Sequence, residues 1–313
     1  MTDPLPFVWL RRGPCVLVAA EPLRAAAEEL GLLEPGRLEA LLARARGPAG
    51  RARTAVVELP GRPEALHLRP LRHGGLLAPL FGDLVFGLGR PRAELRVGAE
   101  LAARGAPVVR PALLAARRRL GPVWRAALAS LHERGTASGL ELLSGAPGRA
   151  RVLRAAAAAG RALRRFHEAG GRHADLHAGN LLVRESGAEP EVLVADLDRA
   201  RVGAAPDAAA RMAELMRLYR SLVKRGYAGA VGPRGCARFL GAYAGRDREL
   251  RRALLRHLPR ERRRLARHRL GYRLRGREPG APRSSRGDLP PPPPRARWRA
   301  RAAPRPRASP RRS

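Results

Sequence analysis

Three oxygen-bearing side chains set the chemistry that this sequence suggests. Asp175 and Asn180 lie five residues apart in the segment His-Ala-Asp-Leu-His-Ala-Gly-Asn, and Asp196 follows sixteen residues after Asn180. A carboxylate can take the proton of a substrate hydroxyl, while an amide and a second carboxylate can hold the magnesium ion that bridges nucleotide phosphates. The spacing therefore predicts Asp175 as a catalytic base, and Asn180 and Asp196 as ligands of Mg²⁺.

The elements around these residues would bring them together. Residues 149–168 carry small and apolar residues at helical spacing, with arginines on the other face, and alanine is the strongest helix former. Gly170 and Gly171 suit the end of that helix. Apolar strands at 181–183 and 192–195 are separated by a polar turn, so a hairpin would return Asp196 to the side of Asn180.

Simpler interpretations of the same residues remain open. An Asp and an Asn at this spacing also occur as caps of loops and turns. His173 and His177 flank Asp175 and suggest zinc, but a hydrolytic zinc site needs a third ligand and none stands out. We expect His173 to be structural, hydrogen-bonding the loop near the acidic turn. We expect His177 to lie near the nucleotide or acceptor, or in solvent.

The segment from about Arg51 to residue 240 resembles the lipopolysaccharide core kinases, and among them the 3-deoxy-D-manno-octulosonic acid (Kdo) kinases. Four stretches carry the resemblance: Leu68–Gly75 (LRPLRHGG), Arg92–Pro111, Ala174–Asn180 and Asp196–Arg199 (Asp-Leu-Asp-Arg). It implies an α+β, two-lobed protein-kinase-like fold, with a small N-terminal antiparallel β-sheet lobe containing one helix and a larger, mainly helical C-terminal lobe. It also implies ATP and Mg²⁺ as cofactors.

The resemblance further implies phosphorylation of a sugar hydroxyl of the lipopolysaccharide inner core, most simply Kdo on a lipid A precursor. A heptose kinase or an aminoglycoside-like small-molecule kinase is the nearest alternative. A pseudokinase that binds without transferring phosphate is another, because the chain has a single lysine, Lys224, far from the strand where kinases place one. An arginine-rich nucleic-acid binder is a third.

Arginine takes the place of the missing strand lysine in this interpretation. We assign Arg69, at the end of the strand 65–69, to the nucleotide phosphates and Glu94, on a helix near 91–104, as its partner. Arg72 is the other choice, and Arg69 could also be one more surface arginine. Gly47 and Gly50 precede the strand 55–59 and are expected in a sparse phosphate-covering loop, although glycine also marks linkers.

Composition divides the chain into three parts. Residues 1–50 form an N-terminal extension with an amphipathic helix near 35–46, residues 51–270 form the kinase-like domain, and residues 271–313 form an Arg/Pro-rich tail. The smaller lobe is expected over about 51–134, with strands near 112–116 and 126–133, and the larger lobe over 139–270, with helices at 207–225 and 234–270. The tail cannot bury enough apolar surface to offset its conformational entropy, so we expect disorder there.

The charge of the chain points to an anionic partner. The formal net charge is +35, with arginine almost excluding lysine. The sequence lacks nucleic-acid motifs and has few aromatic residues, so we expect no nucleic-acid partner. We expect the glycolipid precursor and the anionic inner-membrane surface as partners. With two cysteines and neither a signal peptide nor a spanning helix in the sequence, we expect peripheral attachment at the cytoplasmic face of the inner membrane.

Overall fold

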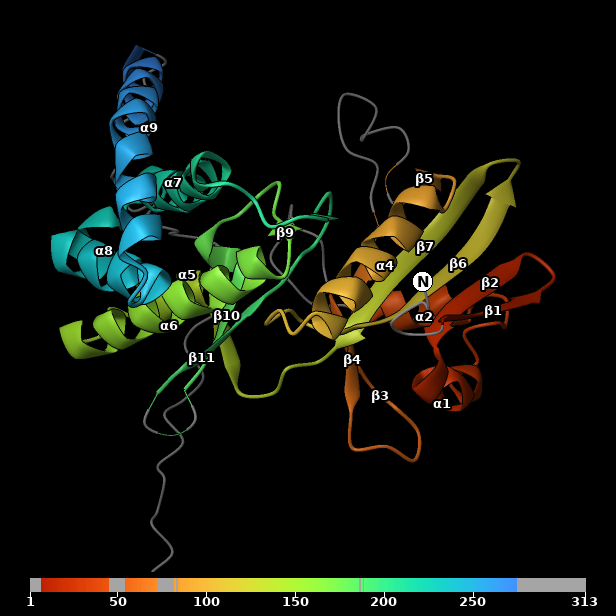
Figure 1. Cartoon of the computed structure of the whole chain (residues 1–313). Coiled ribbons are helices and arrows are strands. Elements are labelled where there is room, and N and C mark those ends of the chain that lie inside the picture. Colours follow the sequence, from red (N-terminus) through yellow and green to blue (C-terminus); the bar gives the residue numbers. More distant parts are fainter. Residues whose placement is uncertain are drawn as a thin grey trace, which may run out of the picture.

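The computed structural model describes residues 7–44, 54–71, 82, 84–185, 187 and 189–274, with side chains described as far as residue 267. These residues form two lobes, as the resemblance implies, and the segment 132–135 joins them (Figure 1). Gly47, Gly50, Arg72 and the Gly74–Gly75 pair lie outside the described residues, as does the tail from residue 275 onward.

The smaller lobe is built on one antiparallel sheet. Its strand order is β1-β2-β6-β7-β4-β3, and β5 pairs with β7. The strands are β1 (Phe7–Arg12), β2 (Cys15–Ala20), β3 (Ala55–Glu58), β4 (Ala65–Pro70), β5 (Leu84–Phe86), β6 (Pro111–Leu120) and β7 (Val123–Leu131). The long β6–β7 hairpin forms its centre, and β4 leads Arg69 to the edge that faces the larger lobe.

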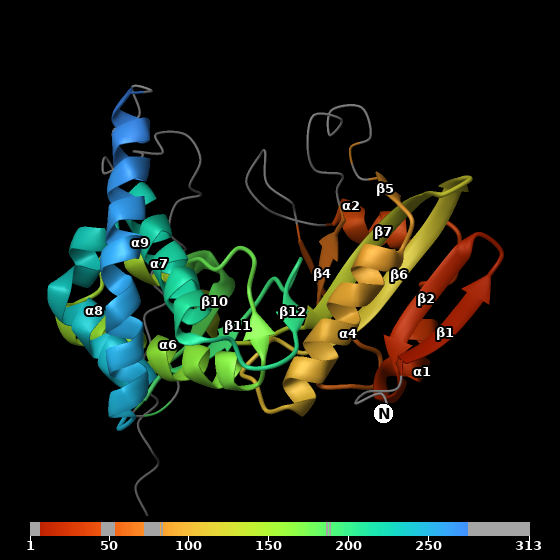
Figure 2. The ribbon, with the colours of Figure 1, turned by 45° about the horizontal axis from the view of Figure 1, so that its top comes forward.

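Helices cover both faces of this sheet. Leu17 packs with residues of α1 (Arg24–Glu29) and α2 (Arg37–Ala43), whereas Val16 and Val18 pack with Leu95 of α4 (Gly89–Ala103) on the other face. Successive strand residues point to opposite faces, so a strand covered on both sides must be apolar throughout. All six residues of β2 are buried accordingly. Figure 2 shows α4 lying across β6 and β7.

The boundary that the sequence analysis drew at residue 50 does not coincide with a structural boundary. Strands β1 and β2 belong to the sheet of the smaller lobe, since β2 pairs with β6 over Cys15–Ala19. The predicted extension therefore supplies part of that lobe. Its strands were overlooked because the run 15–20 is uniformly apolar and shows no alternation.

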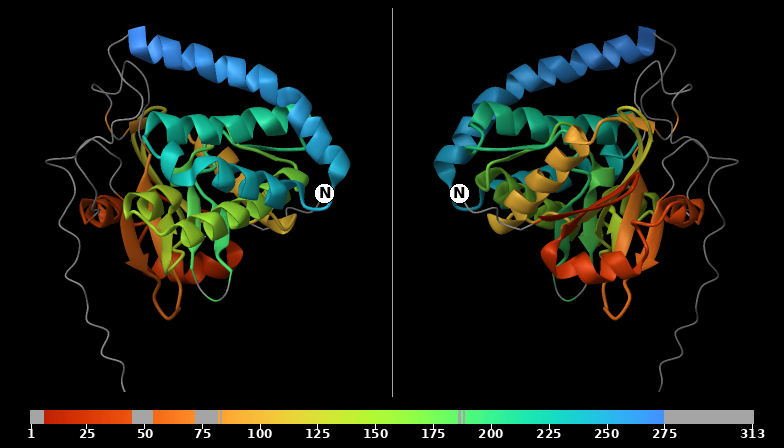
Figure 3. Two further views of the ribbon diagram at one scale, coloured as in Figure 1. Left: turned by 90° about the vertical axis from the view of Figure 1, so that its left-hand side faces the viewer. Right: turned by 90° about the vertical axis from the view of Figure 1, so that its right-hand side faces the viewer.

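The larger lobe is mainly helical. Its helices are α5 (Gly139–Ser144), α6 (Arg149–Glu168), α7 (Ala208–Lys224), α8 (Ala228–Ala244) and α9 (Arg248–Leu274). A capping box at Ser138 begins α5, with Glu141 Oε2 accepting the Ser138 N–H at 2.7 Å. Figure 3 shows α9 as a long rod along the outer side of this lobe. Among the described helices, none combines the length and the apolar character that a membrane crossing requires.

Two small sheets carry the loops of the larger lobe. The hairpin of β10 (Leu181–Arg184) and β11 (Glu191–Val194) pairs with β8 (Thr136–Ser138), and β9 (Gly171–Arg172) pairs with β12 (Arg201–Val202). In the hairpin, Leu181 lies opposite Val194. The residues that follow β11 therefore return to the residues that precede β10, as the sequence predicts.

A close approach of α6 and α8 fixes the helical core. Gly160 lies where the two helices cross, and a Cβ at that position would lie 2.4 Å from the carbonyl oxygen of Phe239 and 3.0 Å from the backbone nitrogen of Tyr243. Only glycine fits such a contact without moving backbone.

The lobes are also joined by backbone contacts beside the acidic turn. Val194 N donates to Pro107 O at 2.7 Å, and Val109 N donates to Val194 O at 3.0 Å. These bonds pin the end of β11 to the segment between α4 and β6 of the smaller lobe. The acidic turn that follows β11 is thereby held at the boundary between the lobes.

Candidate active site

The segment 173–180 is held in place by the buried imidazole of His173. The backbone N–H of Asp175 donates to His173 Nδ1 at 3.1 Å, so the ring proton must be on Nε2. His173 Nε2 lies 3.1 Å from the carbonyl oxygen of Ala195 and donates to it. His173 thus ties the loop that carries Asp175 to the residue just before Asp196, the structural role that the sequence analysis expects.

Asn180 makes a second connection between the same two segments. Its Nδ2 donates to the carbonyl oxygen of Asp175 at 3.0 Å, and its own carbonyl oxygen accepts the N–H of Ala195 at 2.8 Å. Because the side-chain nitrogen is engaged, the orientation of the amide is fixed. The side-chain oxygen Oδ1 is then the atom that Asn180 can offer to a cation.

Asp175 presents its carboxylate to solvent. The side chain is 79% exposed, and Oδ2 lies 3.8 Å from His177 Nε2. Burial of the His177 ring, together with repulsion from Arg225, lowers the pKa of that imidazole against the attraction of Asp175 and Asp196, and the side chain is only 22% exposed. His177 is therefore not in open solvent. An exposed carboxylate on a fixed backbone suits a base that must meet a large acceptor.

The acidic turn after β11 has an unusual backbone. Asp196 has φ of 55° and Arg199 has φ of 59°, both in the left-handed region that few residues other than glycine occupy. Aspartate is among the side chains that enter it more readily, whereas arginine is not. Each such residue costs on the order of 1–3 kcal/mol and persists only where its surroundings impose it. Backbone of this kind concentrates at functional sites, and here it directs the Asp196 carboxylate toward Arg69.

The guanidinium of Arg69 joins two carboxylates from different elements. One terminal nitrogen donates to Glu94 Oε1 of α4 at 2.6 Å, and the other lies 3.5 Å from Asp196 Oδ1. Burial lowers the pKa of Arg69, but attraction to Glu94 and Asp196 outweighs it and the net shift is upward. Burial raises the pKa of Glu94, and repulsion from Asp196 and Asp198 adds to that rise against the attraction of Arg69.

Asp198 pairs with Arg90 rather than with its sequence neighbour Arg199. Arg90 Nε donates to Asp198 Oδ1 at 2.8 Å, and a second guanidinium nitrogen binds the other carboxylate oxygen. Arg90 belongs to the first turn of α4. This bidentate pair connects the smaller lobe to the acidic turn at a point separate from Arg69.

Most of the predicted site residues line one cavity of about 450 Å³ between the lobes. Its wall includes Arg69, Glu94, Asn180 and Asp196, together with the segment that joins the lobes. Asp175 is not part of this wall, but Asn180 holds its backbone beside it. The remaining lining comes from both lobes and includes two further carboxylates, Glu133 and Glu141. The other lining residues are apolar or neutral, among them His67, Leu95, Val109, Leu128, Leu131, His132 and Leu182.

Asn180 and Asp196 have the ligand types that magnesium prefers, an amide oxygen and a carboxylate. Among the described residues, no group of three or more histidine, cysteine, aspartate or glutamate side chains could hold a metal ion. A magnesium ion bound here would therefore take its other ligands from phosphate oxygens and water, which is how such ions are usually held beside nucleotides. The residues present fit that arrangement.

Sequence reasoning overlooked two residues of α7 that hold the loop. Glu214 is buried and its Oε2 accepts the backbone N–H of His173 at 2.9 Å, while Arg217 donates to the carbonyl oxygen of His173 at 2.9 Å. Both peptide groups of His173 are thus fixed from one helix. The sequence holds one sign of this role. Glu214 is a carboxylate among the apolar residues Met212, Leu215 and Met216, and a buried carboxylate needs a hydrogen-bond partner.

Comparison with models of protein families identifies the family of this chain. The model of the lipopolysaccharide kinase (Kdo/WaaP) family matches residues 43–243, which include every predicted site residue. The chain belongs to the lipopolysaccharide kinase family. The match confirms the resemblance that the motifs indicated.

Curated relatives and a solved structure agree with the family. A 3-deoxy-D-manno-octulosonic acid kinase of Xylella fastidiosa is 35% identical over 167 residues, and one of Xanthomonas campestris is 40% identical over 164 residues. Each match covers 50% of this chain and 61% of the length of the relative. The structure of WaaP in complex with acyl carrier protein superimposes with a TM-score of 0.53 at 21% identity, covering 80% of this chain and 98% of that one. That likeness confirms the two-lobed kinase-like fold.

Proposed function

We propose that this chain transfers the γ-phosphoryl group of ATP to a hydroxyl of the lipopolysaccharide inner core, most simply of Kdo on a lipid A precursor. The observation that carries the proposal is the meeting of Arg69, Asn180 and Asp196 in one cavity between the lobes. Family membership and the Kdo kinase relatives support the donor and the acceptor class.

In this proposal each side chain has one task. Asp175 orients the acceptor hydroxyl and takes its proton, and its exposure leaves room for a bulky glycolipid. Arg69, held by Glu94, steadies the α- and β-phosphates of the nucleotide. Mg²⁺ held by Asn180 and Asp196 would neutralise charge on those phosphates. Gly47 and Gly50 are proposed to lie over the nucleotide, although they fall outside the described residues.

Most of the rate enhancement would come from alignment and charge stabilisation. Phosphoryl transfer needs little covalent help from the protein, because the acceptor oxygen and the leaving oxygen only have to be held in line. His173, Asn180 and Glu214 fix the backbone of the loop, so the base is positioned before the substrate arrives. This preorganisation is the structural contribution that the proposal requires.

We further propose peripheral attachment at the cytoplasmic face of the inner membrane. The formal net charge of +35 would draw the chain to anionic lipids, and each basic group near the surface contributes about 1 kcal/mol. The exposed arginines of α9 are the described residues best placed for this contact: Arg248, Arg251, Arg252, Arg256, Arg260, Arg262, Arg263, Arg264 and Arg267. An acceptor anchored in the same leaflet would then diffuse in two dimensions to the site.

The test is transfer of labelled phosphate from ATP to a Kdo-bearing lipid A precursor by the full chain. Asp175→Asn should lower the rate by about 10²–10⁴-fold, the usual contribution of a general base, while leaving the fold intact. Asp207→Asn is the matched control: Asp207 caps α7 through Oδ1, and an asparagine oxygen can accept the same bond.

Three outcomes would contradict parts of the proposal. Undiminished turnover by Asp175→Asn would remove this residue from its role. Transfer to a heptose-bearing core or to an aminoglycoside, with none to Kdo, would change the acceptor. Magnesium-dependent nucleotide binding without transfer to any acceptor would identify a pseudokinase, the result that replacement of the strand lysine by Arg69 could bring about.

A further inference from the structure

The ribbon that leads into the loop carrying Asp175 has two arginines directly opposite each other. In the two-stranded sheet of β9 and β12, Arg172 pairs with Arg201 and Gly171 pairs with Val202. Opposite residues of an antiparallel pair project from the same face, with their Cβ atoms about 4.5–5.5 Å apart. Like charges in that position repel each other and destabilise the pairing.

Both arginines point to solvent. Val202 packs against the core of the larger lobe, and a Cβ at Gly171 would lie 2.7 Å from the ring of Phe166, so these residues mark the inner face of the ribbon. Successive strand residues alternate between faces, which places Arg172 and Arg201 on the outer face. Both are exposed. Figure 2 shows β12 beside α4 of the smaller lobe.

The charge of this pair is not compensated within the described part of the chain. Neither Arg172 nor Arg201 has an ion pair or a side-chain hydrogen bond there. Another opposed pair, Arg117 and Arg125 of β6 and β7, differs in this respect, because Glu39 lies 3.1 Å from Arg117. The outer face of the ribbon can therefore take up an anion that the described residues do not supply.

Arg199 is a third exposed guanidinium in the same segment. It precedes Arg201 by two residues, with the buried Ala200 between them, and it occupies the left-handed backbone region. None of Arg172, Arg199 and Arg201 lines the cleft between the lobes, where Arg69 lies. Their ligand is therefore a group other than the nucleotide phosphates that are assigned to Arg69.

The pair lies within reach of an acceptor bound at Asp175. Three residues separate Arg172 from Asp175, and a chain spans at most about 3.6 Å per residue, so their Cα atoms are no more than about 11 Å apart. The Asp175 side chain is 79% exposed, so it meets solvent as the pair does. An acceptor whose hydroxyl meets Asp175 can present an acidic group of the same or the neighbouring sugar to both guanidiniums.

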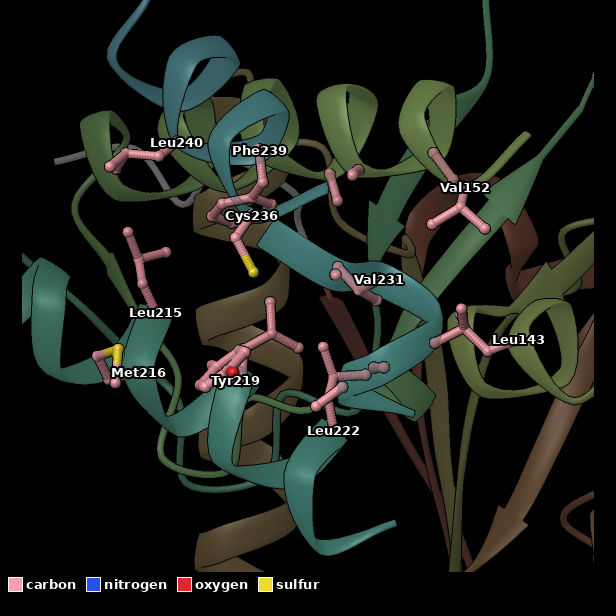
Figure 4. Close-up of a pocket in the computed structure, with 18 of the residues that line it drawn as sticks. Leu143, Val152, Leu215, Met216, Tyr219, Leu222, Val231, Cys236, Phe239 and Leu240 are labelled. Atoms are coloured by element: carbon pink, nitrogen blue, oxygen red, sulfur yellow. The ribbon is translucent and has the colours of Figure 1, made fainter. Parts of the chain in front are cut away.

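The large cavity within the larger lobe does not suit such a group. Its volume is about 720 Å³, and Figure 4 shows Leu215 and Tyr219 of α7 facing Val231 and Cys236 of α8 across it. Among the described residues that line it, Arg262 alone is charged. A carboxylate or phosphate enclosed there would exchange water for mainly apolar contacts. The ribbon instead offers forked guanidinium groups, each able to bind such an anion through two hydrogen bonds.

We propose that Arg172 and Arg201 form an anion-binding subsite that holds a carboxylate or phosphate of the glycolipid acceptor beside Asp175. The inference rests on the proposed function for the identity of the acceptor, and it names residues that would select an acidic one. An anion between the two guanidiniums would replace their mutual repulsion by attraction to a shared partner.

Calorimetry without ATP tests the subsite. The probe is a Kdo-bearing lipid A precursor that has been deacylated, so that it is soluble in water and retains its carboxylate and phosphates. Arg172→Gln and Arg201→Gln should each weaken its binding about tenfold, since each removes a charge-assisted contact. Arg238→Gln is the matched control, because Arg238 is an exposed arginine on α8 of the same lobe. Equal weakening by all three changes would reduce the binding to diffuse attraction and overturn the proposal.

Thermal unfolding separates anion binding from a structural role. Removing one of two opposed like charges should leave the Tm unchanged or raise it. The loss of a structural contact should lower it. Weakened binding together with a lowered Tm in both variants would make Arg172 and Arg201 structural residues, contrary to the proposal.

Two altered probes identify the anion. Methyl esterification of the Kdo carboxylate and enzymatic removal of the lipid A phosphates each take away one candidate. The effect of Arg172→Gln and Arg201→Gln should vanish with the group that the pair binds. An effect that persists after both groups have been altered would overturn the proposal, as would equal binding of the probe by the variants and the unaltered chain.

Transfer assays keep this inference distinct from the proposed function. With the Kdo-bearing precursor as acceptor, both variants should raise the KM for the acceptor and leave kcat and the KM for ATP unchanged. Phosphorylation of Kdo with an unchanged acceptor KM in both variants would refute the subsite and leave the proposed function intact. If no acceptor is phosphorylated, the proposed function fails, and the calorimetric comparison still decides whether the pair binds the anion.

Discussion

Replacing Arg69 by lysine or by methionine distinguishes the contribution of its charge to stability from that of its two-pronged shape. Arg69 uses different nitrogens for its two carboxylates, at 2.6 Å from Glu94 and 3.5 Å from Asp196. Lysine has one nitrogen and can keep only the Glu94 contact. The lost Asp196 pair is partly exposed and is worth about 0.2–1 kcal/mol. At about 2–4 °C per kcal/mol, Arg69→Lys should lower the Tm by about 0.4–4 °C.

Arg69→Met should cost much more, because Glu94 loses its partner. The Glu94 side chain is only 13% exposed, and removing one member of a buried pair costs about 3–5 kcal/mol. The Arg69 side chain is 28% exposed, so we reduce that figure to about 2–3 kcal/mol for solvent screening. The expected loss in Tm is then about 4–12 °C.

The pH dependence gives an independent check on Arg69→Met. Burial already raises the pKa of Glu94 in the folded protein, and loss of Arg69 would raise it further. A carboxyl with a folded-state pKa above its unfolded value costs stability when ionised, and that cost falls as the pH drops from the folded value toward the unfolded value. The deficit of Arg69→Met should therefore shrink between pH 7 and pH 5.

Thermal unfolding followed by circular dichroism measures both effects, with Arg12→Met as the control for removal of an exposed arginine. Equal losses in Arg69→Lys and Arg69→Met would show that neither charge nor the Glu94 contact matters. A methionine variant as stable as the unaltered chain at every pH would make Arg69 one more surface arginine, and the assignment of the pair would fail.

Three further substitutions test the parts that hold the site. His173→Ala leaves the Asp175 N–H and the Ala195 carbonyl unsatisfied, at about 1–3 kcal/mol each in urea unfolding; an unchanged midpoint would contradict the described bonds. Gly160→Ala forces α6 and α8 apart and should cost about 1–3 kcal/mol, whereas Gly229→Ala, with open space around it, should cost less. Ser138→Ala removes a capping box and should cost about 1 kcal/mol, and restoration by Ser138→Thr would confirm the cap.

The catalytic segments could be predicted because their signals are local. The helix over 149–168 has the bounds that its alanine and arginine pattern indicates, and the hairpin of β10 and β11 follows from two apolar runs around a polar turn. Asn180 and Asp196 line one cavity for the same reason, because the hairpin between them is short. Arg69 and Glu94 line it too, but they lie on the smaller lobe and were assigned from the family resemblance.

The partners that hold the site could not be predicted, because they come from distant parts of the chain. Arg90 and Asp198 are 108 residues apart, and Glu214 lies 41 residues from His173. In a chain with 62 basic side chains, sequence alone cannot single out the arginine that pairs with a given carboxylate. The same excess of arginine hid the end of β6. The sequence predicts a strand only near 112–116, because the remaining residues Arg117–Leu120 include three arginines.

The replacement of lysine by Arg69 changes which reagents can detect this cleft. The single lysine of the chain, Lys224, is the exposed last residue of α7, whereas the cleft-facing position on β4 is an arginine. Nucleotide-derived acylating agents label enzymes by capturing an amine, and a guanidinium remains protonated and unreactive toward them. If the cleft binds a nucleotide as proposed, surveys based on amine acylation would overlook it, and dicarbonyl reagents directed at arginine are the suitable substitute.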